Sequence, residues 1–257
     1  MRYFFAAKSQ QASKIIQHFP PHRLYIEPFC GTAIVGIYNI LQNKPKMAIF
    51  NDLDEAAIKR LRGLFKINAK ELIENYPVRF GSAILRASQY SSYLSSNEKE
   101  ILNKARALIT KLLNSLPAKH DYDYIYRYPT LFSLNHLLKL YRLYQRVYKM
   151  AKIEIYNEDA LQLLQEYKKQ WDKGDTLIYL DPPYQNLEQN YRVASKVFKP
   201  LLEIVKNYKN AKIYLSHNTP VDGFEIIETF EVRAYKKRQA NKLRQTPKRV
   251  DYLLLKV

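Results

Sequence analysis

The tetrapeptide Asp181-Pro182-Pro183-Tyr184 follows residues 176–180, a run of β-branched, aromatic and aliphatic residues that is typical of a buried β-strand. Asp181 offers a carboxylate and Pro182 a backbone carbonyl, so two hydrogen-bond acceptors meet at the carboxyl end of this strand. Neither proline has an N–H group to compete for these acceptors, and the two rings stiffen the loop. Tyr184 adds an aromatic face on which a planar group can stack. The alternative is a tight turn that closes the strand, with Asp181 as its cap.

Polar residues also follow four other predicted strands. Singly, each group is explained as well by a loop or a helix N-cap, for which Asp54 and Asp159 are suitably placed. Together they indicate one crevice, because ligands of an open parallel sheet lie outside the carboxyl ends of its strands. The four segments are 27–32 (Glu-Pro-Phe-Cys-Gly-Thr), 51–52 (Asn-Asp), 157–159 (Asn-Glu-Asp) and 216–218 (Ser-His-Asn).

The spacing of Gly31 and Asp52 is that of a nucleoside site. Gly31 follows the first predicted strand, and Asp52 ends the second strand about 20 residues later. In α/β folds the backbone of the first turn and a carboxylate on the ribose hydroxyls hold a nucleoside in this way. The GxGxxG pattern that cradles phosphates is absent from this stretch. A nucleoside without phosphate is therefore expected, and S-adenosylmethionine is the commonest such cofactor.

The elements that must position these residues alternate between strand and helix, which implies a parallel sheet with right-handed crossovers. Pro200 predicts that its helix is kinked there or begins later. Residues 68–148 have an almost purely helical pattern, so we expect a helical insertion in an α/β domain made of residues 1–67 and 149–257. The predicted strands are 23–28, 46–52, 176–180, 211–218, 224–235 and 250–257, with another at the start of 152–167; the predicted helices include 32–42, 54–67, 97–116, 131–150 and 195–208.

Composition narrows the class of protein. The chain has 257 residues, 47% of them hydrophobic, which is enough for a sizeable core. No apolar run reaches the roughly 18 residues that a membrane span needs, and the first residues do not form a signal peptide, so a cytoplasmic protein is expected. Cys30 is the one cysteine, which excludes an intramolecular disulfide and a cysteine-based zinc site.

The charge favours a polyanionic partner. The 42 Lys and Arg residues outnumber the 24 Asp and Glu residues, for a formal net charge of +18. We expect nucleic acid rather than compositional drift, with a membrane surface third. The segment 236–249 is basic and has no acid, so it is either a solvated loop or a loop that contacts phosphates. The segment 120–128 either packs its tyrosines inward or presents Arg127 and tyrosines to bases.

The sequence resembles the Dam-type (D12 class) DNA adenine-N6 methyltransferases over nearly the whole chain. Two segments depart from that family. Ala6-Ala7 precedes Lys8 where the family usually has Gly-Gly, and residues 122–130 replace the Asn-Val-Pro-Phe-Gly-like run of members that read GATC, so no target sequence is implied. The matching segments, in the family's order, are AAK (6–8), EPFCGTAIVG (27–36), NDLD (51–54), a central insertion, NED (157–159), LDPPY (180–184), SHN (216–218) and KRVDYLL (248–254).

The resemblance implies a Rossmann-like methyltransferase sheet, mostly parallel with an antiparallel last strand, and an insertion that recognises the DNA target. It implies S-adenosylmethionine as cofactor, double-stranded DNA as partner, no metal, and a cytoplasmic prokaryotic or phage protein. Restriction–modification, mismatch-repair marking and phage self-protection all stay open as its role. The implied catalytic residues are Asp181, Pro182, Pro183 and Tyr184. The implied cofactor-binding residues are Phe4, Lys8, Glu27, Phe29, Gly31, Asp52, Asp159 and Asp181, and the implied DNA-binding residues are Arg127, Tyr128, Asn218, Lys236, Lys237, Arg238, Lys242 and Arg244.

On this reading, the acceptors of Asp181 and Pro182 hold the two N–H groups of adenine N6 as the nitrogen becomes tetrahedral. Tyr184 would stack on the base, which must leave the duplex to reach the loop. Two alternatives remain. The same chemistry could act on adenine in RNA or on N4 of cytosine, or the chain could be a DNA-binding relative without activity, against which the intact tetrapeptide argues.

Overall fold

The computed structural model describes residues 8, 11–66, 143–144, 146–183, 194–233 and 248–257. The chain forms two compact units, one of Met1–Phe4 with Asp54–Met150 and one of Phe5–Leu53 with Ala151–Val257. Most of the predicted insertion lies outside the described residues, so its boundaries at 68 and 148 stay a prediction. The unit that begins at Phe5 contains the sheet and every described residue of the predicted site.

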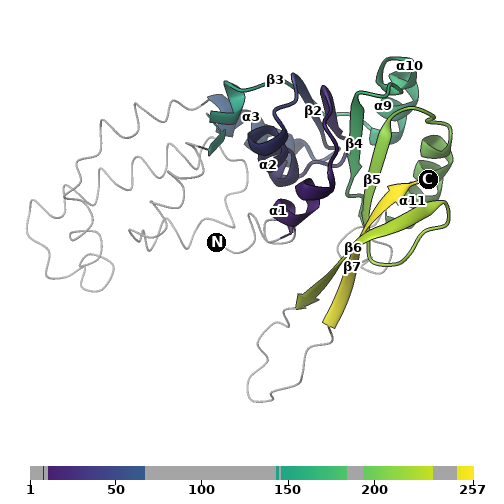
Figure 1. The fold of residues 1–257 in the computed structure, drawn as a ribbon. Coiled ribbons are helices and arrows are strands. Elements are labelled where there is room, and N and C mark those ends of the chain that lie inside the picture. Colours follow the sequence, from purple (N-terminus) through teal and green to yellow (C-terminus); the bar gives the residue numbers. More distant parts are fainter. Residues whose placement is uncertain (1–7, 9–10, 67–142, 145, 184–193, 234–247) are drawn as a thin grey trace, which may run out of the picture. The chain divides into compact units, whose positions relative to one another are not determined.

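The sheet has seven strands in the order β3-β2-β1-β4-β5-β7-β6 (Figure 1). The pairs among strands β1 to β5 are all parallel, and β7 is antiparallel to both β5 and β6. This confirms the predicted mostly parallel sheet with an antiparallel last strand. The order reverses between β1 and β4, where the carboxyl ends of parallel strands form a crevice. The strands are β1 (Leu24–Glu27), β2 (Met47–Asn51), β3 (Lys152–Tyr156), β4 (Thr176–Leu180), β5 (Lys212–His217), β6 (Phe224–Arg233) and β7 (Lys248–Lys256).

One face of the sheet is aliphatic. In the registered pairs of neighbouring strands, Ile26 lies beside Ile49 and Ile178, and Ile178 lies beside Ile213. These side chains share a buried core with leucines and aromatic residues of three helices. The helices cover this face in Figure 1 and are α9 (Ala160–Glu166), α10 (Lys168–Trp171) and α11 (Ala194–Lys206).

The opposite face is aromatic. The ring of Phe19 lies 6.2 Å from Tyr25, 5.9 Å from Tyr179 and 4.9 Å from Tyr214, measured between centroids. The alternation along each strand places these tyrosines on the side away from the isoleucines. The elements on this side are α1 (Ala12–Ile15), the 3-10 turn η1 (Ile16–His18) and α2 (Ile34–Asn43) (Figure 1).

Helix α11 and the short elements α1 and η1 differ from what the sequence predicted. Helix α11 begins at Ala194 and contains Pro200, so the alternative that it begins after the proline is wrong. Pro200 is exposed, and water can bond the carbonyl that its missing N–H leaves free. The short elements α1 and η1 were not predicted, because four and three residues are too few for a clear helical period.

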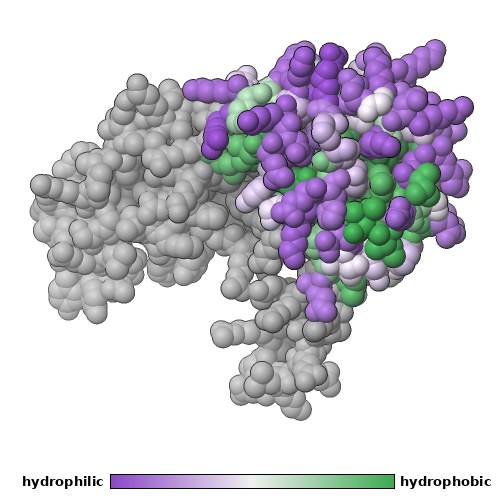
Figure 2. Space-filling view, in the orientation of Figure 1, coloured by the Kyte–Doolittle hydropathy of each residue, from purple (hydrophilic) through white to green (hydrophobic). Residues whose placement is uncertain are grey.

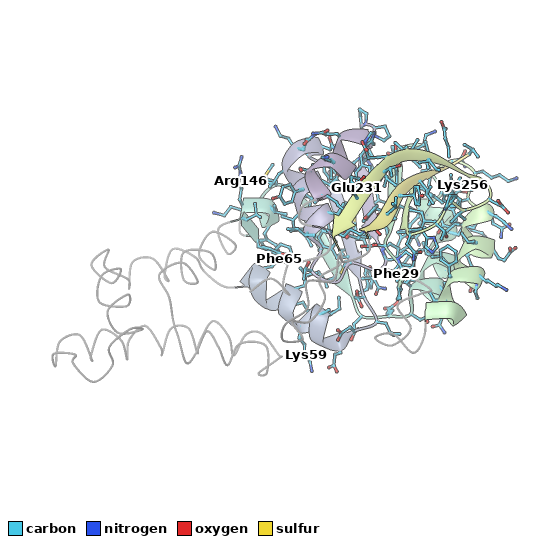
Figure 3. The ribbon with its side chains drawn as sticks, turned by 90° about the horizontal axis from the view of Figure 1, so that it is seen from below. Phe29, Lys59, Phe65, Arg146, Glu231 and Lys256 are labelled. Atoms are coloured by element: carbon cyan, nitrogen blue, oxygen red, sulfur yellow. The ribbon has the colours of Figure 1, made fainter. Side chains whose placement is uncertain are left out.

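The smaller unit contains α3 (Glu55–Lys66), which confirms the helix predicted at 54–67. Its Phe65, labelled in Figure 3, lies 5.3 Å from the ring of Tyr144 and 5.8 Å from the ring of Tyr148. This aromatic contact joins α3 to the described end of the segment predicted as a helix at 131–150.

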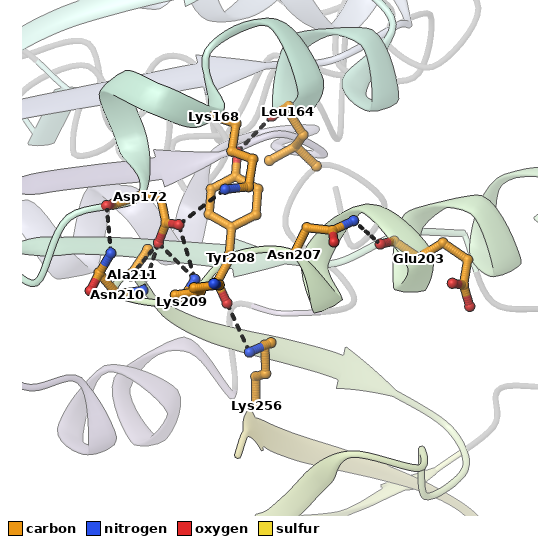
Figure 4. Close-up of polar contacts among 10 residues, drawn as sticks. All are labelled: Leu164, Lys168, Asp172, Glu203, Asn207, Tyr208, Lys209, Asn210, Ala211 and Lys256. Carbon is orange, nitrogen blue, oxygen red and sulfur yellow. Dashed lines mark hydrogen bonds and ion pairs between the residues drawn. The ribbon is translucent and has the colours of Figure 1, made fainter.

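A carboxylate holds together the edge of the sheet where β4 and β5 begin (Figure 4). Asp172 Oδ1 accepts hydrogen bonds from the backbone N–H groups of Lys209, Asn210 and Ala211 at 2.9, 2.6 and 3.1 Å, and Oδ2 accepts one from Lys168 at 3.2 Å. Burial raises the pKa of Asp172, but these hydrogen bonds outweigh it and lower the pKa to about 2. The network is structural and lies at the edge opposite to the predicted site.

The visible face of the molecule is mostly hydrophilic, with hydrophobic residues gathered where β5, β7 and β6 lie (Figure 2). Ile226 of β6 and the terminal Val257 are exposed there. Within the described residues, none of the helices combines the length and apolar character that a membrane crossing requires.

Candidate functional site

The loop after β4 is joined to the segment before α1 by an ion pair. The Nζ of Lys8 lies 3.3 Å from Oδ1 of Asp181, and the two side chains are 9% and 22% exposed. Asp181 follows the last residue of β4, beside β1, at the point where the strand order reverses. The structure therefore places this carboxylate at the point of strand-order reversal, where α/β sheets usually bind ligands.

Pro182 is buried, and Asp181 and Pro183 are half-buried, in the loop that leaves the sheet. The preceding strand is buried at all five positions. A strand packed on both faces fixes where the loop begins, and two prolines restrict the backbone beyond it. The backbone that carries the acceptor oxygens of Asp181 and Pro182 is therefore rigid. Tyr184, predicted to stack on the base, lies outside the described residues.

The turn after β1 is tied directly to the end of β2. The backbone N–H of Gly31 donates to Oδ2 of Asp52 at 2.7 Å. Gly31 has a φ of +49°, which favours glycine, and open space surrounds the position where a Cβ would lie. Asp52 itself is partly exposed. The pair forms a turn whose backbone and carboxylate can face a ligand together.

Glu27, predicted to bind the cofactor, is buried at the end of β1. Its Oε2 accepts hydrogen bonds from the Gly36 N–H and the Tyr25 hydroxyl, both at 3.0 Å. Burial raises the pKa of Glu27 well above its usual value, the bond from Tyr25 lowers it, and the neighbouring Asp181 raises it further. A side chain at Gly36 would collide with Glu27, Tyr25 and Phe50. Glu27 therefore docks the start of α2 against β1, and a contact with the cofactor stays a prediction.

Asn51 was named in the sequence analysis only as one of the polar residues at strand ends, without a role of its own. It is fully buried, and its amide nitrogen donates to the carbonyls of Pro28 and Glu158, both at 3.0 Å. Its Oδ1 accepts from the N–H of Glu158 at 2.9 Å. One side chain thus ties together the loops after β1, β2 and β3. The sequence signal was a polar residue at the last position of a buried strand.

Leu53 is a second residue that sequence reasoning missed. It follows Asp52 directly and is 64% exposed, which is unusual for a large apolar side chain. The side chain of Asn157 holds the backbone here by donating to the carbonyls of Asp52 and Leu53 at 2.8 and 3.3 Å. An exposed apolar side chain therefore directly follows the carboxylate of Asp52 in the chain.

Asp159 is the N-cap of α9. Its Oδ1 accepts from the N–H groups of Leu161 and Gln162 at 2.8 and 3.0 Å. This confirms the helix-capping alternative for Asp159, while its predicted contact with the cofactor stays a prediction.

The segment after β5 is held by a histidine. The ring of His217 stacks on Phe198 with centroids 4.3 Å apart, and its Nδ1 lies 2.9 Å from the Thr219 hydroxyl. Burial lowers the pKa of His217, which favours the neutral ring. Asn218, between the two, has a buried Oδ1 with no hydrogen-bond partner among the described residues. The parallel pairing of Leu180 with Leu215 puts this segment beside the loop of Asp181.

The structure thus brings Lys8, Glu27, Gly31, Asp52 and Asp181 to one edge of one sheet. Phe29, labelled in Figure 3, is only partly buried and packs against the aliphatic core. No cluster of three or more metal-ligating side chains occurs in the part of the chain that the structure describes. The predicted site residues outside the described residues are Phe4, Arg127, Tyr128, Tyr184, Lys236, Lys237, Arg238, Lys242 and Arg244.

Comparison with known proteins gives one strong match. The model of the D12 class N6 adenine-specific DNA methyltransferase family matches residues 7–200. No curated protein matches the sequence. Among solved structures, the rRNA methyltransferase aviRa from Streptomyces viridochromogenes aligns at 13% identity and a TM-score of 0.45, covering 97% of this chain and 85% of that one. TrmK from M. capricolum, in complex with S-adenosyl-homocysteine, aligns at 11% identity and a TM-score of 0.35, covering 96% of this chain and 66% of that one.

Proposed function

Because the chain belongs to the D12 class of N6 adenine-specific DNA methyltransferases, we propose that it methylates N6 of a flipped-out adenine at specific sites in double-stranded DNA. The methyl donor of this methyltransferase is S-adenosylmethionine. The observation that carries the proposal is the carboxylate of Asp181, paired with Lys8 where the strand order reverses. An acceptor group in that place suits an amino substrate better than a carbonyl or phosphate substrate.

The residues at the sheet edge fit this cofactor. S-adenosylmethionine supplies a methyl group on a positively charged sulfur. Asp52 would accept hydrogen bonds from the ribose hydroxyls, and the exposed Leu53 would pack on the purine. Gly31 leaves room at the turn, where a side chain would take up space. The further cofactor contacts that we propose are those of Phe4, Lys8, Glu27, Phe29, Asp159 and Asp181.

The acceptor side of the reaction depends on the loop after β4. Adenine N6 is a poor nucleophile, because its lone pair is delocalised into the ring. Asp181 and the carbonyl of Pro182 would accept its two N–H groups and favour a tetrahedral nitrogen. The new C–N bond to N6 would replace the methyl–sulfur bond of the bound donor, and the Asp181 carboxylate would take up the surplus proton of N6 and release it to solvent. Lys8 would keep that carboxylate in place through their ion pair.

The DNA would meet a basic chain. The net charge of +18 gives a long-range attraction to phosphates. Flipping the adenine out of the duplex costs a few kcal/mol, which stacking on Tyr184 would partly offset. We assign phosphate contacts to the basic segment 236–249. Arg127, Tyr128 and Asn218 are our candidates for contacts to bases.

The test is a methylation assay with the purified protein. Radiolabelled S-adenosylmethionine would be incubated with duplex DNA and with RNA, and the modified nucleoside identified by mass spectrometry, with Asp181→Ala as control. We expect N6-methyladenine in DNA alone. N4-methylcytosine, or methylation confined to RNA, would overturn the proposed acceptor while leaving the methyltransferase family in place.

A further inference from the structure

A second buried polar pair lies on the same face of the sheet as Lys8 and Asp181. The Nε2 of Gln11 donates to Oδ2 of Asp251 at 3.4 Å. Gln11 is 6% exposed, and Asp251, in the middle of β7, is 1% exposed. These residues were not assigned a role by the sequence analysis, although Asp251 lies inside the matched segment KRVDYLL.

The pair is connected to Lys8 through one turn of backbone. The N–H groups of Gln11 and Ala12 both donate to the carbonyl oxygen of Lys8, at 3.0 and 2.6 Å. Helix α1 has four residues and no side-chain cap at its start, so a contact with the sheet adds support to this turn. The bond from Gln11 to Asp251 anchors the turn to the sheet.

The charges of the two pairs are close to each other. Burial is the largest cause of the lowered pKa of His217, and a backbone hydrogen bond with Thr219 raises that pKa. The charge of Asp251 raises it further and the charge of Lys8 lowers it, so both residues act on the same ring. Asp251 and Asp181 both raise the pKa of the buried Tyr179. The strand β7 is thus electrostatically linked to the residues beside the loop of Asp181.

We propose that Gln11 and Asp251 are positioning residues, which orient Lys8 so that its ammonium group meets Asp181. This inference rests on the proposed function, because it gives the pair a task in methyl transfer. Neither residue touches the acceptor or the cofactor in this role. Their effect reaches the reaction through the backbone of Lys8 and the ion pair with Asp181.

The hydrogen bonding of Gln11 supports a role beyond stability. Its Oε1 is buried and has no hydrogen-bond partner among the described residues. A buried unsatisfied oxygen destabilises the fold, and an apolar residue of similar size would avoid that cost. Residues that weaken the fold in this way are expected at functional sites.

The test reverses the hydrogen bond between the two positions. Gln11→Glu places a second carboxylate against Asp251, so the turn of Lys8 should move away. We expect the single-turnover rate at saturating cofactor and acceptor to fall about tenfold or more. The double variant Gln11→Glu with Asp251→Asn restores one donor and one acceptor and should return the rate to within about threefold of the wild type. DNA affinity should stay unchanged, and cofactor affinity is measured separately, because Lys8 is also a proposed cofactor contact.

Gln17→Glu is the matched control, because it makes the same change at an exposed position of η1 and should leave the rate unchanged. If the pair served stability alone, Gln11→Glu would lower the unfolding temperature and leave the rate of the folded protein intact, which would overturn the inference. Should Gln11→Glu not fold, Gln11→Ala is measured instead, and a wild-type rate in that variant is equally decisive. The assay uses whichever acceptor the wild type methylates, so an RNA acceptor would refute the proposed DNA substrate without touching this inference. A wild type with no turnover on any acceptor would overturn both.

Discussion

Lys8 and Asp181 form an ion pair of 3.3 Å between residues at opposite ends of the matched family segment. Lys8 precedes the first helix, and Asp181 follows the fourth strand of the sheet. The pair puts a positive charge beside the carboxylate that we propose as the acceptor for N6. Lys8 was expected from the family resemblance to bind the cofactor, and this contact gives it a second task.

We expect Lys8→Met to slow methyl transfer about tenfold or more, which corresponds to about 1.4 kcal/mol in the transition state. The reason is that the half-buried carboxylate of Asp181 is less well placed without its ion pair to Lys8. Lys8→Arg keeps the charge and should retain most of the rate. Single-turnover kinetics with radiolabelled cofactor would measure both variants. Equal rates for Lys8→Met and the wild type would show that the ion pair has no part in the reaction.

Asp52→Ala should weaken cofactor binding by roughly ten- to a hundredfold, since losing a hydrogen bond to a charged group costs about 1.5–3 kcal/mol. Asp52→Asn keeps an acceptor for the N–H of Gly31 and serves as the control for the turn itself. Calorimetric titration with S-adenosylmethionine measures the effect. An unchanged affinity in folded Asp52→Ala would refute the assignment of Asp52 to the ribose.

Asp172 should make the free energy of unfolding fall at low pH. Its pKa of about 2 in the folded state lies below its ordinary value of 3.8, so its stabilising effect is full above about pH 4 and is lost as the pH falls towards 2. The shift corresponds to about 2 kcal/mol. Urea unfolding at pH 7 and pH 3 should show a smaller difference in Asp172→Asn than in the wild type. The same acid dependence in both proteins would contradict the network of Figure 4 as its cause.

Each phosphate contact of the basic segment should appear in the salt dependence of DNA binding. Removing one such contact lowers the slope of log affinity against log salt by about 0.9. Lys212→Gln, at the opposite edge where β5 begins, should leave the slope unchanged. A variant that instead loses preference for one DNA sequence would show that its residue reads bases. The residues to be changed are Lys236, Lys237, Arg238, Lys242 and Arg244.

The parts of the fold that sequence predicted well are those with a local pattern. The strand 176–180 is bounded by turn residues, and the structure places β4 at Thr176–Leu180. The spacing of Gly31 and Asp52 predicted a shared nucleoside site; the two residues are in direct contact, and their binding of a nucleoside stays a prediction. Pro200 predicted the start of its helix less well, since α11 begins before this exposed proline and continues through it.

The contacts between distant segments could not be predicted. Asn51 joins loops after three strands, and only the strand order reveals that these loops are neighbours. Gln11 and Asp251 meet because β7 inserts between β5 and β6 and brings its middle close to the chain before α1. No periodicity in the sequence determines such an insertion.

The proposed role of Asp181 is decided by two measurements on Asp181→Ala: the rate of single-turnover methyl transfer and the affinity for DNA. Asp181 is proposed to act on the amine mainly as the nitrogen becomes tetrahedral. Removing the Asp181 carboxylate should therefore lower the rate of methyl transfer and leave DNA binding unchanged. We predict that the rate falls by at least about a hundredfold, as for other groups that stabilise charge in a transition state, while DNA binding survives. Adenine methylation by Asp181→Ala at the wild-type rate would contradict the mechanism.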